Sequence, residues 1–207
     1  MATFKTQIED LIGPVEDDAA LTQFLSDGAR EIISIFPPNL RETCYSKQTF
    51  TSAAANSEAE TMVTGQLGSV YAGSVSCRQI KPMDKHKASD SGSIEYASAT
   101  DPVYYVEGGK INILPASSSG VYYVISNPSV AHGDSAITNF PNEAEYLVVL
   151  YAAIKAGEKL MVSEEDPELF APMIATLKQD YDKGIKMLTG GTAPTQSQKL
   201  GDIAIPK

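Results

Sequence analysis

Residues 140–156 read FPNEAEYLVVLYAAIKA, and this stretch predicts the central helix of the fold. Pro141 suits the first turn of a helix, where a backbone N–H would have no intrahelical partner. The following positions place apolar groups around much of the helical circumference: Tyr146, Leu147, Val149, Leu150, Ala153, Ile154 and Gly157. A helix that is apolar on most sides must be surrounded by other elements. We therefore expect it to lie at the centre of a helical bundle.

The N-terminal part of the chain supplies partners for that helix. A short helix over residues 4–12 is predicted to stop at Gly13-Pro14, and Asp17 or Asp18 is expected to cap a second helix. The second helix should end at Pro37-Pro38, because proline lacks a backbone donor and fixes φ. Its apolar residues recur at three- and four-residue spacing and form one face: Leu21, Phe24, Leu25, Gly28, Ile32, Ile35 and Phe36.

Between residues 43 and 126 the pattern changes to short runs rich in β-branched and aromatic residues. The clearest hairpin runs from Tyr104 to Ile113, where Gly108-Gly109 can supply the positive φ of a tight turn. An antiparallel sheet or a small barrel is therefore predicted. Its strands are expected at Tyr45–Thr51, Thr61–Thr64, Val70–Ile80, Val103–Val106, Ile111–Leu114 and Val121–Ile125.

A last helix is predicted to open at Asp166-Pro167-Glu168, with Asp166 as its N-cap, and to end at Gly190-Gly191. Its apolar stripe comprises Phe170, Met173, Ile174, Leu177, Tyr181, Ile185 and Leu188. Residues 190–207 have no helical period and contain two prolines. This segment is expected to form an extended arm whose apolar side chains need a groove or an edge strand on another chain. Those side chains are Leu200, Ile203 and Ile205.

Together these patterns predict an α+β fold in which a helical bundle from both chain ends carries an inserted antiparallel β domain and an extended C-terminal arm. The expected parts are N-terminal helices over 1–42, a β-rich insertion over 43–139, C-terminal helices over 140–189 and the arm over 190–207. A chain of 207 residues is long enough to bury most of its apolar surface without disulfides or metals.

Composition restricts the kinds of partner. The net charge of −10 argues against a broad phosphate-binding face, because affinity for nucleic acid comes largely from lysine and arginine. An acidic wall suits a path along which DNA slides without adhering. Cys44 and Cys77 lack the spacing of a redox or metal motif, and without a secretory signal they are expected to be buried thiols. No run reaches the roughly 20 apolar residues of a membrane span, so we expect a protein of the cytoplasm or of a particle assembled there.

Most of the positive charge in the β region lies in residues 78–87, which include Arg78, Lys81, Lys85 and Lys87. Three interpretations remain open for this basic run: a solvated loop, a contact for an acidic neighbouring protein, or a loop that faces DNA.

No complete catalytic site is expected, so the chain is not predicted to be an enzyme, and no cofactor is expected. His132, Asp134 and Ser135 provide the residue types of a serine triad, but residues this close in one loop cannot easily form the required hydrogen-bond chain. Residues 164–166 are acidic and precede a helix, where negative charge favours the helix dipole. A metal site around His86 lacks further ligands at suitable spacing.

Three parts of the sequence together resemble the head-to-tail adaptor (neck or connector) proteins of tailed bacteriophages. These parts are the N-terminal helix with Ala29-Arg-Glu-Ile-Ile33, the strands with Asp101-Pro-Val-Tyr-Tyr-Val106 and Ile111-Asn-Ile-Leu-Pro115, and the helix at residues 143–153 followed by the trailing arm. The resemblance implies a ring, commonly of twelve copies, that docks beneath the portal in the neck of the virion. The β insertion departs from the smallest all-helical adaptors.

That resemblance implies a mechanical function: joining the portal to a tail or nozzle protein and lining the DNA exit channel, with DNA only passing through. Other structural roles remain open, namely a tail-tube, tail-terminator or head-decoration subunit. From a different class, a carbohydrate-binding or hydrolytic virion protein is a further alternative.

Overall fold

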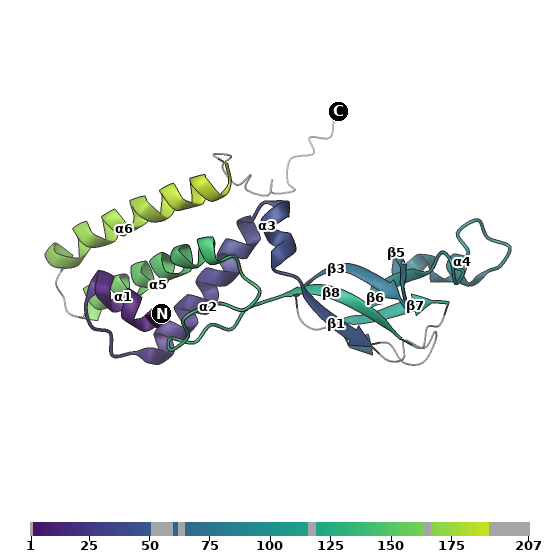
Figure 1. Cartoon of the computed structure of the whole chain (residues 1–207), viewed down its shortest axis with the longest axis horizontal. Helices are drawn as coiled ribbons and strands as arrows, with labels where there is room; N and C mark the ends of the chain where they lie inside the picture. The colour runs from purple at the N-terminus through teal and green to yellow at the C-terminus, as the bar shows by residue number, and fades with distance from the viewer. Residues whose placement is uncertain (1, 51–59, 62–64, 116–118, 164–166, 191–207) are drawn as a thin grey trace, which may run out of the picture. The chain divides into compact units, whose positions relative to one another are not determined.

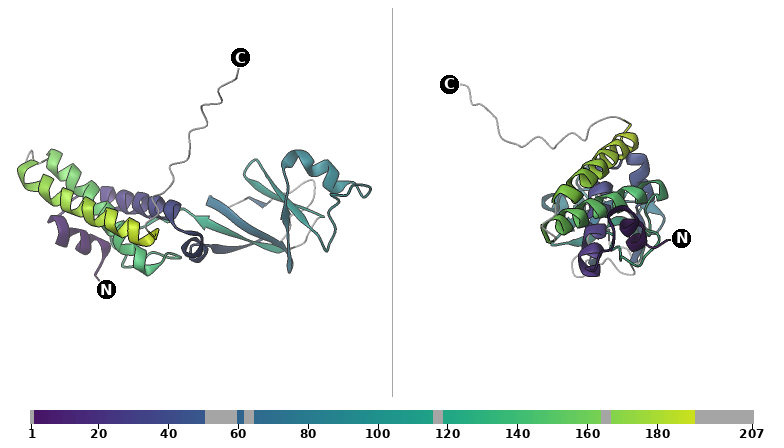
Figure 2. Two further views of the ribbon diagram at one scale, coloured as in Figure 1. Left: turned by 90° about the horizontal axis from the view of Figure 1, so that it is seen from above. Right: turned by 90° about the vertical axis from the view of Figure 1, so that its left-hand side faces the viewer.

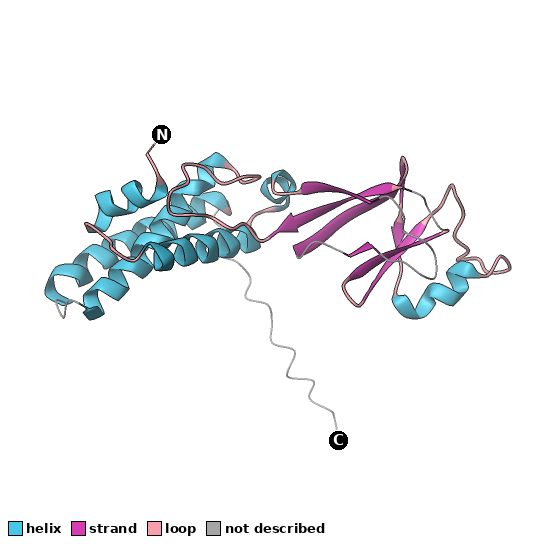
Figure 3. Ribbon diagram, turned by 90° about the horizontal axis from the view of Figure 1, so that it is seen from below, coloured by secondary structure: helices cyan, strands magenta, loops and turns pink. Residues whose placement is uncertain are grey.

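The computed structural model describes residues 2–50, 60–61, 65–115, 119–163 and 167–190. The protein has an α+β fold, as predicted, and its chain divides into two compact units. The helical unit comprises the described residues of Met1–Arg41 and Pro128–Lys207, and the β unit comprises those of Glu42–Asn127. Figure 3 shows that the strands all belong to one unit.

The helical unit contains α1 (Phe4–Ile12), α2 (Asp18–Ile35), α5 (Asn142–Ser163) and α6 (Pro167–Leu188). Helix α5 packs against the other three, and Figures 1 and 2 show α5 and α6 side by side. Ten residues of α5 are buried, including Val148, Leu150 and Ala152. The helix with the most continuous apolar pattern is therefore surrounded by both ends of the chain.

Local capping explains where the N-terminal helices begin and end. The carboxylate of Asp17 accepts a hydrogen bond from the Ala20 N–H at 2.9 Å, which identifies Asp17 as the N-cap of α2. Gly13 follows α1 with φ of 87°, and its N–H donates to the Glu9 carbonyl. The predicted stop at Gly13-Pro14 is confirmed.

The Pro37-Pro38 pair ends α2, as predicted, but it also begins a short helix that was not predicted. Helix α3 (Pro38–Thr43) starts at the second proline, a residue well suited to the first helical position because it needs no N–H partner there. The carbonyl of Pro37 accepts hydrogen bonds from the N–H groups of Leu40 and Arg41.

The predicted boundary of the β insertion at residue 139 differs from the structure, because residues 128–139 belong to the helical unit. Backbone N–H groups of Phe4 and Lys5 donate to the carbonyls of Asp134 and His132. The Val130 N–H also donates to the Ser26 hydroxyl at 3.0 Å. These bonds tie the loop to α1 and α2.

The β unit contains two four-stranded sheets. The first has the order β1 (Ser46–Phe50), β8 (Gly120–Ser126), β3 (Gly65–Ala72), β4 (Val75–Ser76), and all of its pairs are antiparallel. The second has the order β2 (Glu60–Thr61), β7 (Lys110–Leu114), β6 (Val103–Glu107), β5 (Arg78–Gln79). Strands β5 and β6 pair in parallel, so the expectation of a wholly antiparallel sheet is wrong for this pair.

The single strand predicted over Val70–Ile80 is divided in the structure. Gly73 has φ of 59° and turns the chain between β3 and β4, and β5 then joins the other sheet. A 3-10 helix, η1 (Pro82–Asp84), and helix α4 (Lys85–Ser89) follow. The predicted hairpin is confirmed, since Gly108 and Gly109 have φ of 60° and 73° between paired β6 and β7.

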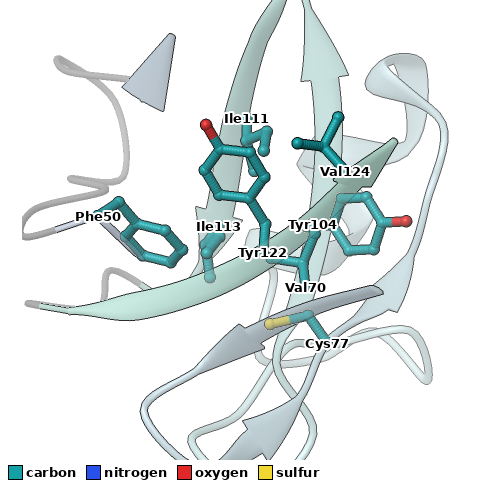
Figure 4. Close-up of a cluster of buried hydrophobic side chains, with 8 residues drawn as sticks. All are labelled: Phe50, Val70, Cys77, Tyr104, Ile111, Ile113, Tyr122 and Val124. Carbon is teal, nitrogen blue, oxygen red and sulfur yellow. The ribbon is translucent and has the colours of Figure 1, made fainter. Parts of the chain in front are cut away.

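Side chains from both sheets form one buried cluster, shown in Figure 4. It joins strands that are distant in sequence and provides the apolar interior that either sheet alone lacks. Its members are Phe50, Val70, Cys77, Tyr104, Ile111, Ile113, Tyr122 and Val124.

Candidate functional site

A largely apolar surface hollow of the helical unit is a groove between the first turns of α5 and the last turns of α6. Its volume is about 550 Å³. Two large apolar side chains on this groove are exposed to solvent, Tyr146 at 54% and Met187 at 84%. The lining residues of this α5–α6 groove are Glu143, Tyr146, Leu147, Asp180, Lys183, Gly184, Met187 and Leu188.

Gly184 lies in the groove lining, where α6 meets Leu147 of α5. A Cβ atom at this position would lie 2.3 Å from Leu147 Cδ2, so a larger residue here would force the end of the Leu147 side chain to move. Polar groups stand beside the apolar lining, and Lys183 Nζ lies 3.0 Å from Asp180 Oδ1. The groove is therefore suited to bind a segment in which apolar side chains have charged residues on either side.

Several residues of the predicted arm and helix cap lie outside the described part of the chain. They are Leu200, Ile203 and Ile205 of the arm, and Glu164, Glu165 and Asp166 before α6. The described chain reaches Gly190, where φ of 64° follows the end of α6.

The basic run of the β unit is largely neutralised by carboxylates of the same unit. Arg78 pairs with Asp101 at 3.2 Å, and Lys85 pairs with Glu107 at 3.3 Å. A further cation, Lys87, lies 3.0 Å from a carboxylate oxygen of Asp84 and holds the pKa of that group below its ordinary value. Among the four predicted contact cations only Lys81 has no ion pair within the part of the chain that the structure describes. These pairs favour a structural role for the run over a phosphate-binding one.

The loop residues that resembled a triad contact other groups. His132 Nε2 lies 3.4 Å from Asp18 Oδ2, and its Nδ1 lies 3.2 Å from the Thr22 hydroxyl. The Asp134 carboxylate accepts from the Ala131 N–H at 2.8 Å. His132 thus joins the loop to α2, as the backbone bonds of the same loop do.

A second hollow, in the β unit, is lined by tyrosines. Tyr71 and Tyr123 meet edge to face with ring centroids 6.1 Å apart, and the Tyr45 ring lies over Gly68. Aromatic faces of this kind can stack on a sugar or a base, which is the geometric basis of the carbohydrate-binding alternative. The hollow is open to solvent, and cross-strand packing accounts for the contact between Tyr71 and Tyr123.

Ion pairs join α1, α2 and α5 and give the helical unit a predicted response to acid. Lys159 hydrogen-bonds to Asp17, and Lys5 hydrogen-bonds to Asp18 at 2.7 Å. Each lysine lowers the pKa of its carboxyl below the ordinary 3.8.

A lowered pKa in the folded state means that unfolded chains bind protons more readily. The stabilisation is therefore complete above about pH 3.8 and is lost as pH falls through the folded-state pKa values. We expect the thermal midpoint of the helical unit to drop as the pH falls below about 4, where the folded-state carboxylates take up protons. Lys159→Met should make the drop smaller. Lys183→Met removes a lysine whose ion pair with Asp180 lies within α6 and joins no other helix, so it should leave the drop unchanged. An equal drop in all three proteins would contradict the assignment.

Other classes of site have less support. No group of three or more histidine, cysteine or acidic residues that suits a metal occurs among the residues the structure describes. Within that same part, no helix combines the length and apolar composition needed to cross a membrane. Cys44 and Cys77 are separate buried thiols, as expected, and burial raises the pKa of the Cys77 thiol.

The sequence pattern did not indicate the α5–α6 groove. It placed Tyr146 on the apolar surface of a central helix, whereas the structure leaves that ring half exposed at the first turns. Met187 lies beside the predicted stripe of α6 rather than on it, and Gly184 carries no hydrophobic signal. The one available indication was that the stripe residue Leu188 continues the apolar surface to the end of α6, where the arm begins.

No protein-family model matches the chain, and no curated protein matches it. Function is therefore inferred from the chain's own residues and geometry.

Proposed function

We propose that this protein is a virion structural subunit, a head-to-tail adaptor that forms a ring between the portal and the tail of a bacteriophage. The observation that carries the proposal is the division of one chain into a helical unit and a β unit. Its two ends supply helices that pack on a shared central helix, while the middle supplies a separate β unit. A subunit that must contact ring neighbours and two axial partners needs such distinct surfaces.

In this proposal the helices of both chain ends act as one bundle that anchors the subunit in its ring. The acidic composition, with a net charge of −10, limits adhesion of DNA that passes through the channel. Ring symmetry repeats each weak contact between subunits many times. The internally paired basic run supports a protein-facing or solvated β unit better than one that holds DNA.

A second structural candidate, a tail-tube, tail-terminator or head-decoration subunit, is compatible with the same units. The tyrosine-lined hollow of the β unit favours the third candidate, a carbohydrate-binding virion protein. Binding of purified protein to glycans, abolished by Tyr123→Ala, would favour that candidate.

Truncation tests the contribution of the arm. A chain ending at Gly191 is expected to unfold with unchanged cooperativity but to attach to its neighbour or portal about tenfold or more weakly, because Leu200, Ile203 and Ile205 are lost. Sedimentation of mixtures with the portal encoded in the same genome measures the affinity. Thr195→Asp in the full chain is the matched control, since it changes a polar position of the arm; unchanged affinity after truncation would refute the arm.

A further inference from the structure

We propose that the α5–α6 groove of each copy receives the C-terminal segment, residues 199–205, of a neighbouring copy. The inference deepens the proposed function and rests on it for the choice of a neighbour, because a ring provides one arm and one groove at every interface.

The groove has the shape and polarity for such an occupant. Its volume of about 550 Å³ suits a few aliphatic side chains, and the exposed Met187 can adapt its flexible side chain to them. The arm offers three aliphatic groups within six residues, Leu200, Ile203 and Ile205. Their apolar side chains can pack against the exposed apolar side chains of the groove lining.

The groove lies where the chain leaves the helix. Met187 and Leu188 are groove residues, and α6 ends at Leu188. From Gly190 to Leu200 there are ten peptide units, which span at most about 35 Å. In a ring whose neighbouring copies place their α6 ends within that distance, the arm can reach the groove of the next copy.

Charges on the two sides are complementary. Lys199 and Lys207 flank the three aliphatic residues of the arm, and Glu143 and Asp180 stand in the groove lining. Asp180 and Lys183 of the lining pair with each other at 3.0 Å, so a pair between Asp202 of the arm and Lys183 would replace that contact. Exposed pairs of this kind add little affinity, but they fix the register in which the apolar groups enter.

Cross-linking of full-length chains tests the docking and its direction. One preparation carries Met187→Cys and a second carries Ile203→Cys; the mixture is treated with a short thiol-to-thiol cross-linker. We expect a covalent dimer in the mixture and much less in either preparation alone. The unsubstituted chain gives the background from Cys44 and Cys77, which are both buried.

The matched control replaces Met187→Cys with Leu169→Cys, an exposed apolar position at the other end of α6. Equal dimer yields from the two positions would overturn the groove as the receptor. A double variant, Met187→Cys with Ile203→Cys, that forms only a bond within one chain at every protein concentration would overturn the exchange between copies.

A charge placed in the groove gives an independent measurement. Met187→Asp is expected to weaken self-association about tenfold or more, while Leu169→Asp leaves it unchanged. Both positions are largely exposed, so the subunit should still fold. Equal effects of both variants would contradict the proposal. If the protein forms rings that bind the portal but gives no selective cross-link, docking of the arm in the groove is refuted and the adaptor function is not. If the cross-link is selective but no portal complex forms, the adaptor function is refuted and the docking is not.

Discussion

Replacing Leu150 by alanine is expected to lower the free energy of unfolding of the helical unit by about 2–5 kcal/mol. Leu150 has no exposed surface and lies in the middle of α5, the helix that packs against α1, α2 and α6. Removing its side chain leaves a cavity, because α5 is held by three neighbouring helices that cannot all move inward to fill the space. Chemical denaturation followed by the circular dichroism of the helices measures the change.

The matched control for this substitution is Leu169→Ala on α6, where the side chain is 63% exposed. Its expected effect on the free energy of unfolding is within about 0.5 kcal/mol, because the Leu169 side chain is already largely exposed to solvent in the folded protein. Equal losses for the two leucines would contradict the central position assigned to α5.

Gly120→Ala is expected to destabilise the β unit by about 1–3 kcal/mol or more. Gly120 lies on β8, between Phe50 of β1 and Ala72 of β3. A Cβ atom there would stand 2.2 Å from both the Phe50 ring and the backbone oxygen of Tyr71. Because backbone oxygen cannot rotate away, the strands must separate.

Gly92→Ala serves as the control within the same unit, since the nearest atom to its added Cβ is an Asp90 carboxylate oxygen at an ordinary 3.4 Å. Urea unfolding followed by tyrosine fluorescence compares the two variants, since seven of the ten tyrosines lie in the β unit. A Gly120→Ala protein as stable as Gly92→Ala would mean that β1, β8 and β3 do not pack as described.

Local signals predicted much of the fold. Asp17 caps α2, Gly13 ends α1, and Gly108-Gly109 form the turn between β6 and β7, each because one residue type satisfies a local backbone requirement. The nearly continuous apolar run within residues 140–157 likewise predicted α5 as a central helix. Such signals depend on residues only a few positions apart.

Features that depend on distant residues were not predictable from these patterns. Ser26 and Val130 are 104 positions apart, so their hydrogen bonds, which join the loop at 128–139 to the helical unit, have no local signature. The parallel pairing of β5 with β6 depends on how the chain returns after β4. Short strands and helices such as β5 and α3 also lack enough residues to show a period.

The candidate surfaces were predicted less well than the fold. Four cations in residues 78–87 left a solvated loop, a protein contact and a DNA-facing loop all open. Asp101 and Glu107, which pair with Arg78 and Lys85, come from a later part of the sequence. The α5–α6 groove arises from a glycine and two helix ends, none of which carries a motif. The sequence patterns therefore identified charged and apolar residues that could form a contact surface. They did not show which charges are neutralised by ion pairs, or which apolar side chains stay exposed.

The mass of the purified full-length protein, measured alone and mixed with the portal encoded in the same genome, tests the adaptor proposal most directly. The proposal predicts a discrete ring, or a discrete complex of this protein with the portal, with a whole-number ratio of subunits. A protein that stays a monomer in both samples and cleaves or binds a glycan would contradict it.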